Sequence, residues 1–175
     1  MNKDRLPPIP KKQWSAEQWR YAQEIINGPR GALIAPFVPL MRSPELMSLS
    51  QKMGEYLRYR SALPSKFSEF AILITAQQWS QEIEWQIHLP IAIQAGISED
   101  IVNSLSSNVY PSNMNEGEKL VYEFCRQLHF EKKVNDKIWN QAIEHFGEQG
   151  VIDLIGIIGY YSFLAMLMNA AQTGK

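Results

Sequence analysis

The amino-acid sequence predicts an all-α protein. Apolar residues recur every three or four positions along most of the chain, as in Leu46, Leu49 and Met53, which is the spacing of a helix with one buried face. Helix-start signals such as Ser43-Pro44-Glu45 precede these stretches. No stretch alternates between apolar and polar residues as a half-buried strand would. These observations predict a helical bundle.

The N-terminal part is expected to combine an extended arm with one helix. The segment Leu6-Pro7-Pro8-Ile9-Pro10 is too rich in proline for a helix, so residues 1–13 are expected to be extended. Ser15 and Gln18 have the spacing of a capping box, which predicts a helix start. Gly28-Pro29 ends that helix.

The remaining helices are expected to follow a loop over residues 31–39. Ser43-Pro44-Glu45 opens the first of them, and Leu63-Pro64-Ser65 ends it and opens the next. The later expected helices cover residues 82–95 with a kink at Pro90, a short stretch after Ser98, a stretch from Asn115 to Leu128, a stretch from Asn135 to about Gly147, and residues 150–169.

Length and composition are typical of one globular domain. The chain has 175 residues, 45% of them hydrophobic and 20% charged, which is enough for a sizeable core. Its formal net charge is -1 and no block of like charge stands out, so a nucleic acid is not an expected partner. One domain over residues 1–175 is therefore expected.

The most apolar stretch, Leu154 to Met168, is expected to be a buried helix rather than a membrane span. It is shorter than the roughly 20 residues that a bilayer requires, and it contains Gly156, Gly159 and two tyrosines. The N-terminus carries no apolar signal-peptide segment. A cytoplasmic protein with no membrane partner is expected.

The single cysteine and two of the three histidines are expected to be structural. Cys125 cannot form an intrachain disulfide, and its use fits a reducing compartment. Its helical neighbours Tyr122 and Leu128 indicate a small buried side chain. His129 and His145 have no evident partner and are expected at the surface.

The residues that most suggest chemistry are Glu69, Gln81, Glu84 and His88. Gln81 follows Glu69 by twelve positions, Glu84 follows Gln81 by three, and His88 follows Glu84 by four. Glu84 and His88 lie one helical turn apart and can share a face. Carboxylates beside an imidazole form an acid/base group suited to proton transfer to a small substrate.

This frame resembles the carboxymuconolactone decarboxylase and alkylhydroperoxidase-D superfamily. In its thiol-dependent branch a glutamate is followed by a CxxC pair and a histidine. Glu69 and His88 stand at the glutamate and histidine positions, whereas Gln81 and Glu84 stand at the two cysteine positions. Segments on either side are also similar to the family: residues 53–60, 95–96, 147–154 and 159–161.

The resemblance implies an alkylhydroperoxidase-D-like helical bundle, with a family core over about residues 44–130 and a C-terminal helix over about 150–169. It also implies a homo-oligomer, a trimer or a hexamer. Gly156 and Gly159 would let another backbone approach the last helix closely. The proline-rich arm and five tryptophans add apolar surface for such an assembly.

The function that the resemblance implies is that of the decarboxylase-type branch, which lacks the CxxC pair. Members of this branch are lyases that act on a carboxylated muconolactone without a cofactor. A cofactor-independent enzyme is therefore expected, acting on a small carboxylated or lactone-like substrate. Its catalytic residues would be Glu69, Glu84 and His88, and its substrate-binding residues would be Gln81, Arg58 and Trp85.

Two other functions stay open. The first is the peroxidase, or peroxiredoxin-type, activity of the alkylhydroperoxidase-D branch, against which the missing CxxC pair counts. The second is a non-catalytic member that binds a small ligand. No metal is expected, because no second histidine completes a ligand set around Glu69, Glu84 and His88.

Each candidate residue is also compatible with a purely structural role. His88 fits a core histidine with a carboxylate or backbone partner, and Glu84 fits a surface partner of His88. Glu69 fits a first-turn glutamate that complements the helix dipole. Arg58 fits an exposed helix end, and Trp85 fits a core or interface position.

Overall fold

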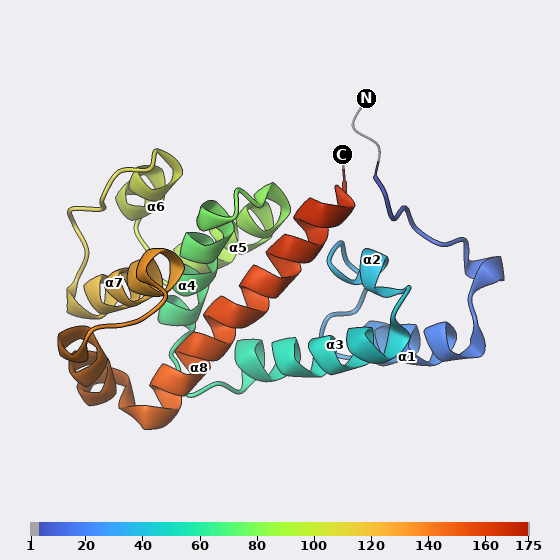
Figure 1. The fold of residues 1–175 in the computed structure, drawn as a ribbon, viewed down its shortest axis with the longest axis horizontal. Coiled ribbons are helices and arrows are strands. Elements are labelled where there is room, and N and C mark those ends of the chain that lie inside the picture. Colours follow the sequence, from blue (N-terminus) through green and yellow to red (C-terminus); the bar gives the residue numbers. More distant parts are fainter. Residues whose placement is uncertain (1–3, 175) are drawn as a thin grey trace. The chain divides into compact units, whose positions relative to one another are not determined.

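The computed structural model describes residues 4–174, whose regular structure is helical and contains no strand (Figure 1). The predicted all-α class is confirmed. The elements are the 3-10 turn η1 (Lys11–Gln13) and the helices α1 (Ala16–Asn27), α2 (Phe37–Leu40), α3 (Pro44–Tyr59), α4 (Ser65–Gln78), α5 (Glu82–Gln94), α6 (Glu99–Ser106), α7 (Glu116–Glu131) and α8 (Asp136–Ala171).

The described chain divides into two compact units. Residues 4–59 and 163–174 form the first unit, and residues 60–162 form the second. Helix α8 begins in the second unit and ends in the first. The two carboxylates and the histidine of the motif all lie in the second unit.

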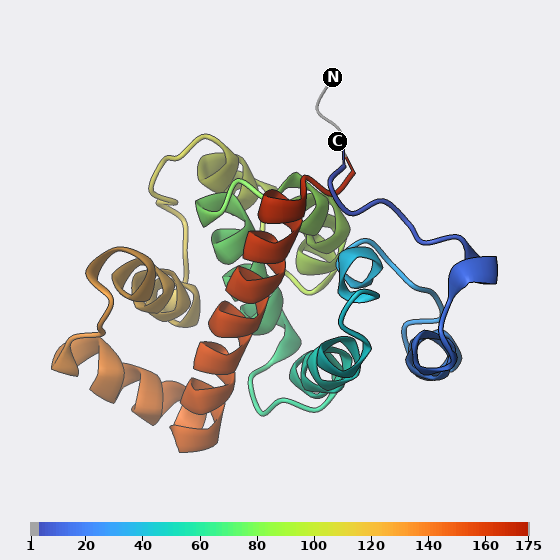
Figure 2. The same ribbon diagram turned by 45° about the vertical axis from the view of Figure 1, so that its right-hand side comes forward.

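The first unit contains the predicted helix start at Ser15 and a tethered N-terminal arm. The capping box between Ser15 and Gln18 is present, and α1 packs against α3 (Figures 1 and 2). In the arm, the Arg5 backbone N–H donates to the Ala171 carbonyl at 2.8 Å, and the Arg42 guanidinium donates to the carbonyls of two arm residues. The described part of the arm is therefore tied to its own unit, and Met1–Lys3 lie outside the described residues.

Two short elements of the first unit differ from the sequence prediction. The arm contains η1, and the expected loop over residues 31–39 contains the start of α2. In α2 the Phe37 side chain is fully buried, and the Arg30 guanidinium lies over its ring at 4.9 Å. Pro39 fits here because the first turn of a helix needs no internal N–H donor. Burial of Phe37 therefore favours a helical turn where the prolines had indicated a loop.

Helix α4 is the centre of the second unit. All its residues from Ser68 to Ala76 are buried, and it packs against α5, α6 and α7. A helix that is apolar on all sides belongs in the interior of a fold. Its predicted start after Pro64 is confirmed, and so are the predicted N-caps of α6 at Ser98 and of α7 at Asn115.

Helix α8 is two helical segments joined at Gly147. This glycine has φ 71° and ψ 167°, a left-handed conformation that glycine adopts without steric cost, at the predicted boundary. By length and mean hydropathy α8 could cross a membrane, but 56% of its most apolar window is buried within the protein. The carboxylate of Asp153 in this helix accepts a hydrogen bond from the Ala62 N–H at 2.7 Å. These properties are typical of a core helix.

Helix α7 is joined to α4 by an ion pair and a close steric contact. The Lys66 ammonium lies 2.7 Å from the buried Glu118 carboxylate. A Cβ atom placed on Gly117 would lie 2.5 Å from Cζ of Phe67. The Phe67 ring is itself held by an edge contact with Phe146, so it has little room to retreat.

We expect Gly117→Ala to lower the free energy of unfolding by about 1–3 kcal/mol, because overpacking outweighs the gain in helix propensity. The matched control is Gly159→Ala in α8, where an added Cβ has no neighbour within 4 Å. That control should raise the stability by up to about 1 kcal/mol. Urea titrations of both variants measure the difference. Equal effects of the two substitutions would contradict the proposed contact.

Candidate functional site

The structure brings Glu69, Glu84 and His88 into one cluster. Oε2 of Glu69 lies 2.6 Å from Nδ1 of His88. Oε2 of Glu84 lies 3.5 Å from Nε2 of the same ring. The imidazole therefore stands between two carboxylates, one at each nitrogen. The sequence predicted that these three side chains lie close together, and the distances confirm this prediction.

The turn between α4 and α5 produces this cluster. Only residues 79–81 separate the two helices, and Ser80 adopts a left-handed conformation with φ 48°. This tight connection folds α5 back against α4. Glu69, ten positions before the turn, thereby faces His88, seven positions after it. Glu84 reaches the other side of the ring because it lies one turn earlier on α5.

The two carboxylates make unequal contacts with the ring. A separation of 2.6 Å is that of a short, charge-assisted hydrogen bond, so a proton lies between Glu69 and Nδ1. A separation of 3.5 Å exceeds an ordinary hydrogen bond, so Glu84 contacts Nε2 more loosely. Glu69 therefore fixes the orientation of the ring, and Nε2 is the nitrogen with the longer carboxylate contact. In hydrolase triads a carboxylate likewise binds one imidazole nitrogen, while the other nitrogen transfers the proton.

The cluster is almost closed off from solvent. The exposed fractions are 5% for Glu69, 2% for Glu84 and 2% for His88. The Tyr161 ring of α8 packs edge-on against the imidazole, with centroids 5.0 Å apart. Low dielectric strengthens each electrostatic contact here. The contact of Tyr161 with His88 depends on tertiary structure, because the two residues are 73 positions apart and share no local sequence signal.

The structural alternatives for the three residues can now be compared with the geometry. Glu69 lies beyond the first turn of α4, which contains no acidic residue, so it is not a dipole partner there. Glu84 does pair with His88, but it is buried rather than on the surface. His88 has the carboxylate partner that both the structural and the catalytic hypotheses require, so its role must be decided by experiment.

The predicted substrate-binding residues fall into two groups. Gln81 and Trp85 line a cavity of about 260 Å³ at the start of α5, where the Gln81 side chain accepts a hydrogen bond from the Ile83 N–H. Arg58 belongs to the first unit. Its guanidinium lies 5.4 Å from the centroid of the neighbouring Tyr59 ring. Of the three predicted substrate-binding residues, Gln81 and Trp85 therefore lie together in the second unit, and Arg58 lies in the first.

The donor set does not form a metal centre. In residues 4–174, no group of three His, Cys, Asp or Glu side chains is arranged to hold a metal ion. The reason at this cluster is geometric. The two carboxylates face opposite nitrogens of His88, whereas three ligands of one ion must converge on a single point.

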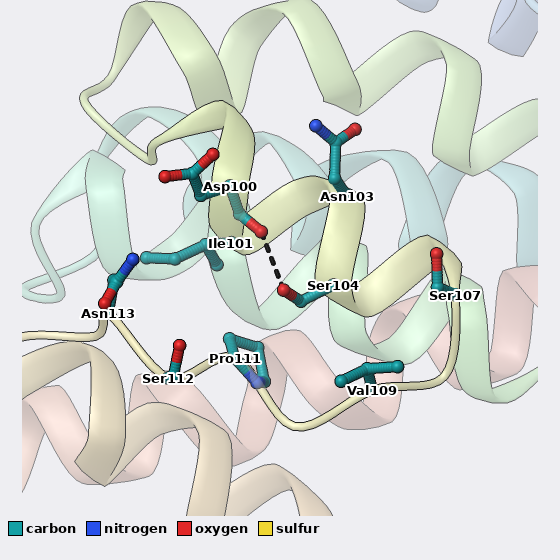
Figure 3. A pocket seen from close by; sticks show the side chains of 9 residues that line it. All are labelled: Asp100, Ile101, Asn103, Ser104, Ser107, Val109, Pro111, Ser112 and Asn113. Atoms are coloured by element: carbon teal, nitrogen blue, oxygen red, sulfur yellow. Dashed lines mark hydrogen bonds between the residues drawn. The ribbon is translucent and has the colours of Figure 1, made fainter.

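A further cavity of about 380 Å³ lies along α6 and the loop that follows it (Figure 3). Ser104 lines it and donates a hydrogen bond to the Asp100 carbonyl at 2.8 Å. The other lining residues come from the same helix and from Val109 to Asn113. None of the predicted site residues is among them.

Cys125 and the two remaining histidines differ in their environments. Cys125 is fully buried, and burial raises the pKa of its thiol well above the ordinary value. His145 is exposed, as predicted. His129 is half-buried with its Nε2 3.3 Å from the Thr75 hydroxyl, so the expectation of a surface position was wrong for it. Helical spacing alone did not reveal that α7 turns this ring toward α4.

Among known proteins, no family model matches this chain and no curated protein matches it. The likeness to the decarboxylase superfamily therefore stands on the residues of the motif and its flanking segments.

We expect Cys125 to resist thiol reagents while the chain is folded. A buried thiol with a raised pKa holds almost no thiolate, which is the reactive species. Labelling with a chromogenic disulfide should be at least about a hundredfold slower in buffer than in 6 M guanidinium, on the usual scale of burial effects. Stoichiometric labelling within seconds in buffer would contradict the buried placement.

Proposed function

We propose that this protein is a cofactor-independent enzyme that performs acid/base chemistry on a small carboxylated or lactone-like substrate. The observation that carries the proposal is the buried imidazole held between two carboxylates. Superfamily membership, in the decarboxylase-type branch, is part of the proposal. Glu69, Glu84 and His88 are its catalytic residues.

In the proposed reaction His88 acts as the acid. The carbon–carboxylate bond of the substrate breaks, CO2 leaves, and the bonding electron pair moves into the conjugated lactone carbonyl as an enolate. The proton on Nε2 then passes to the substrate carbon. Glu69 keeps the ring oriented at Nδ1 throughout, and Glu84, 3.5 Å from Nε2, returns a proton taken from water. General acid catalysis of this kind contributes about 10²–10⁴-fold.

The proposed substrate site is the cavity beside Gln81 and Trp85, whose lining does not itself include Glu69, Glu84 or His88. Gln81 and Trp85 lie on the same turns of α5 as Glu84. The cavity combines polar side chains such as Gln77 and Ser80 with the apolar ring of Trp85, which suits a small molecule with a polar edge. In the proposal, substrate enters here and approaches Nε2 from the Glu84 side.

The peroxidase alternative is less well supported. Its nucleophile would have to be Cys125, and that thiol is fully buried with a raised pKa. Cys125 also lies on α7 rather than in the frame between Glu69 and His88. A non-catalytic ligand-binding role remains the main competitor, because the same cluster also stabilises the core.

The decisive assay follows CO2 release from a carboxylated muconolactone. Glu69→Gln and His88→Gln should each lower kcat by about 10²–10⁴-fold. Glu99→Gln is the matched control, because Glu99 lies in the first turn of α6, its side chain is exposed, and it does not line the cavity beside Gln81 and Trp85. Circular dichroism and thermal melting establish that each variant is folded. Folded variants with full activity would return both residues to a structural role, and an inactive wild type would favour ligand binding.

We also propose a homo-oligomer, a trimer or a hexamer. The helical spacing of Leu46, Leu49 and Met53 predicted a buried face of α3, but that prediction was wrong, because each of the three is between 43% and 59% exposed. A continuous exposed apolar stripe of this kind marks an interaction surface.

Light scattering at micromolar concentration should therefore give a mass of three or six times 20.1 kDa. Leu49→Lys should shift the mass toward the monomer, because it places a charge on the apolar stripe. Asn140→Lys serves as a charge-matched control, because Asn140 is exposed on α8, outside the apolar stripe of α3. A monomer mass for the wild-type chain would contradict the proposed assembly.

A further inference from the structure

A pocket of about 330 Å³ lies in the second unit between α4, the end of α6 and α7, and it holds chemistry that the proposed reaction does not use. Its apolar lining comes from Ile74 and Leu105, which are buried, and from Val109 and Phe130, which are more than half exposed. Its polar lining includes Gln78 and His129. The pocket is therefore an apolar slot with a few hydrogen-bonding groups, which is the usual character of a small-molecule site.

The hydrogen bonds of Thr75 fix the tautomer of His129. The Thr75 hydroxyl donates its only hydrogen to the Ala71 carbonyl at 2.8 Å. It can then only accept from Nε2 of His129, which lies 3.3 Å away. Nε2 must therefore carry the ring hydrogen, and Nδ1 keeps the lone pair. Burial, with the nearby Lys132 ammonium, lowers the pKa of His129 and keeps the ring neutral. Nδ1 is thus a hydrogen-bond acceptor.

The charges around the pocket disfavour an anion. The Arg126 guanidinium is engaged by two carboxylates, with Nε 3.0 Å from Glu123 and Nη2 3.1 Å from Glu131. With Lys132, which lies near enough to His129 to lower its pKa, two cations face two carboxylates, and the Arg126 guanidinium is already paired, so the pocket offers an anion no unpaired guanidinium. Burial and the Glu123 charge raise the pKa of Tyr122, so its phenol stays neutral. The lining therefore consists of neutral groups and one guanidinium that two carboxylates already engage.

We propose that this pocket binds a small, uncharged aromatic molecule bearing a hydroxyl or N–H donor, a phenol being the simplest, with the donor hydrogen-bonded to Nδ1 of His129. The ring of the ligand lies against Val109 and Phe130. The site is distinct from the Glu69 cluster. A hydrogen bond between the Gln77 and Asn108 side-chain amides borders it, and both residues also line the cavity beside Gln81.

The test is a titration of the ¹⁵N-histidine-labelled full chain with three probes of similar size: p-cresol, toluene and benzoate. In the free protein the ring spectrum should report His129 as the Nε2–H tautomer. p-Cresol should shift the Nδ1 resonance of His129 in a saturable way. Toluene and benzoate should bind roughly five- to tenfold more weakly, because toluene has no polar group and the benzoate carboxylate can only accept a hydrogen bond, so neither donates to Nδ1.

Three variants locate the binding. His129→Phe should reduce p-cresol affinity to the level of toluene, and His145→Phe, an exposed histidine outside the pocket, should leave it unchanged. Phe130→Ala removes an exposed wall residue and should weaken all three probes by similar factors. If His129→Phe does not fold, Phe130→Ala is the variant that tests whether the probes bind in this pocket.

Three results would each overturn the proposal: the Nδ1–H tautomer in the free protein, no saturable shift with p-cresol, or equal affinity for p-cresol and benzoate.

Discussion

The contact between the Glu69 carboxylate and the His88 imidazole is the constraint that organises the second unit. Two carboxylates and an imidazole are buried with almost no access to water, and burying charges is favourable only when they are paired and hydrogen-bonded. Their pairing requires α5 to return along α4 at a fixed register. The three-residue turn at Ser80 provides that return, so the turn, the helix packing and the site depend on one another.

The same constraint makes structural and chemical roles hard to separate at this cluster. A short bond at Nδ1 holds the ring rigidly, and a rigid ring is what a proton donor at Nε2 needs. The looser contact with Glu84 leaves that proton able to move. Glu84 lies 3.5 Å from Nε2, so the two ring nitrogens have carboxylate contacts of unequal length. This asymmetry is the physical reason for favouring proton transfer.

The environments of Cys125 and His129 show how neighbouring positions on one helix acquire different chemistry. Both lie on α7, one turn apart. Cys125 points fully into the core and its thiol is held protonated. His129 stands at the edge of the core, where the Thr75 hydroxyl takes one ring nitrogen and leaves the other as an acceptor. Partial burial therefore fixes the tautomer of the His129 ring and still leaves the ring accessible from the pocket.

Local sequence signals alone determined the all-α class and most helix starts, because capping residues such as Ser15, Ser98 and Asn115 and breakers such as Pro64 and Gly147 act within one turn of themselves. The spacing of Glu84 and His88 likewise predicted a shared face. Tertiary structure alone decided that Phe37 is buried and forms α2, that Tyr161 packs on His88, and that Glu69 bonds Nδ1 rather than Nε2. These outcomes depend on contacts between residues far apart in the chain, and a local pattern does not contain such contacts.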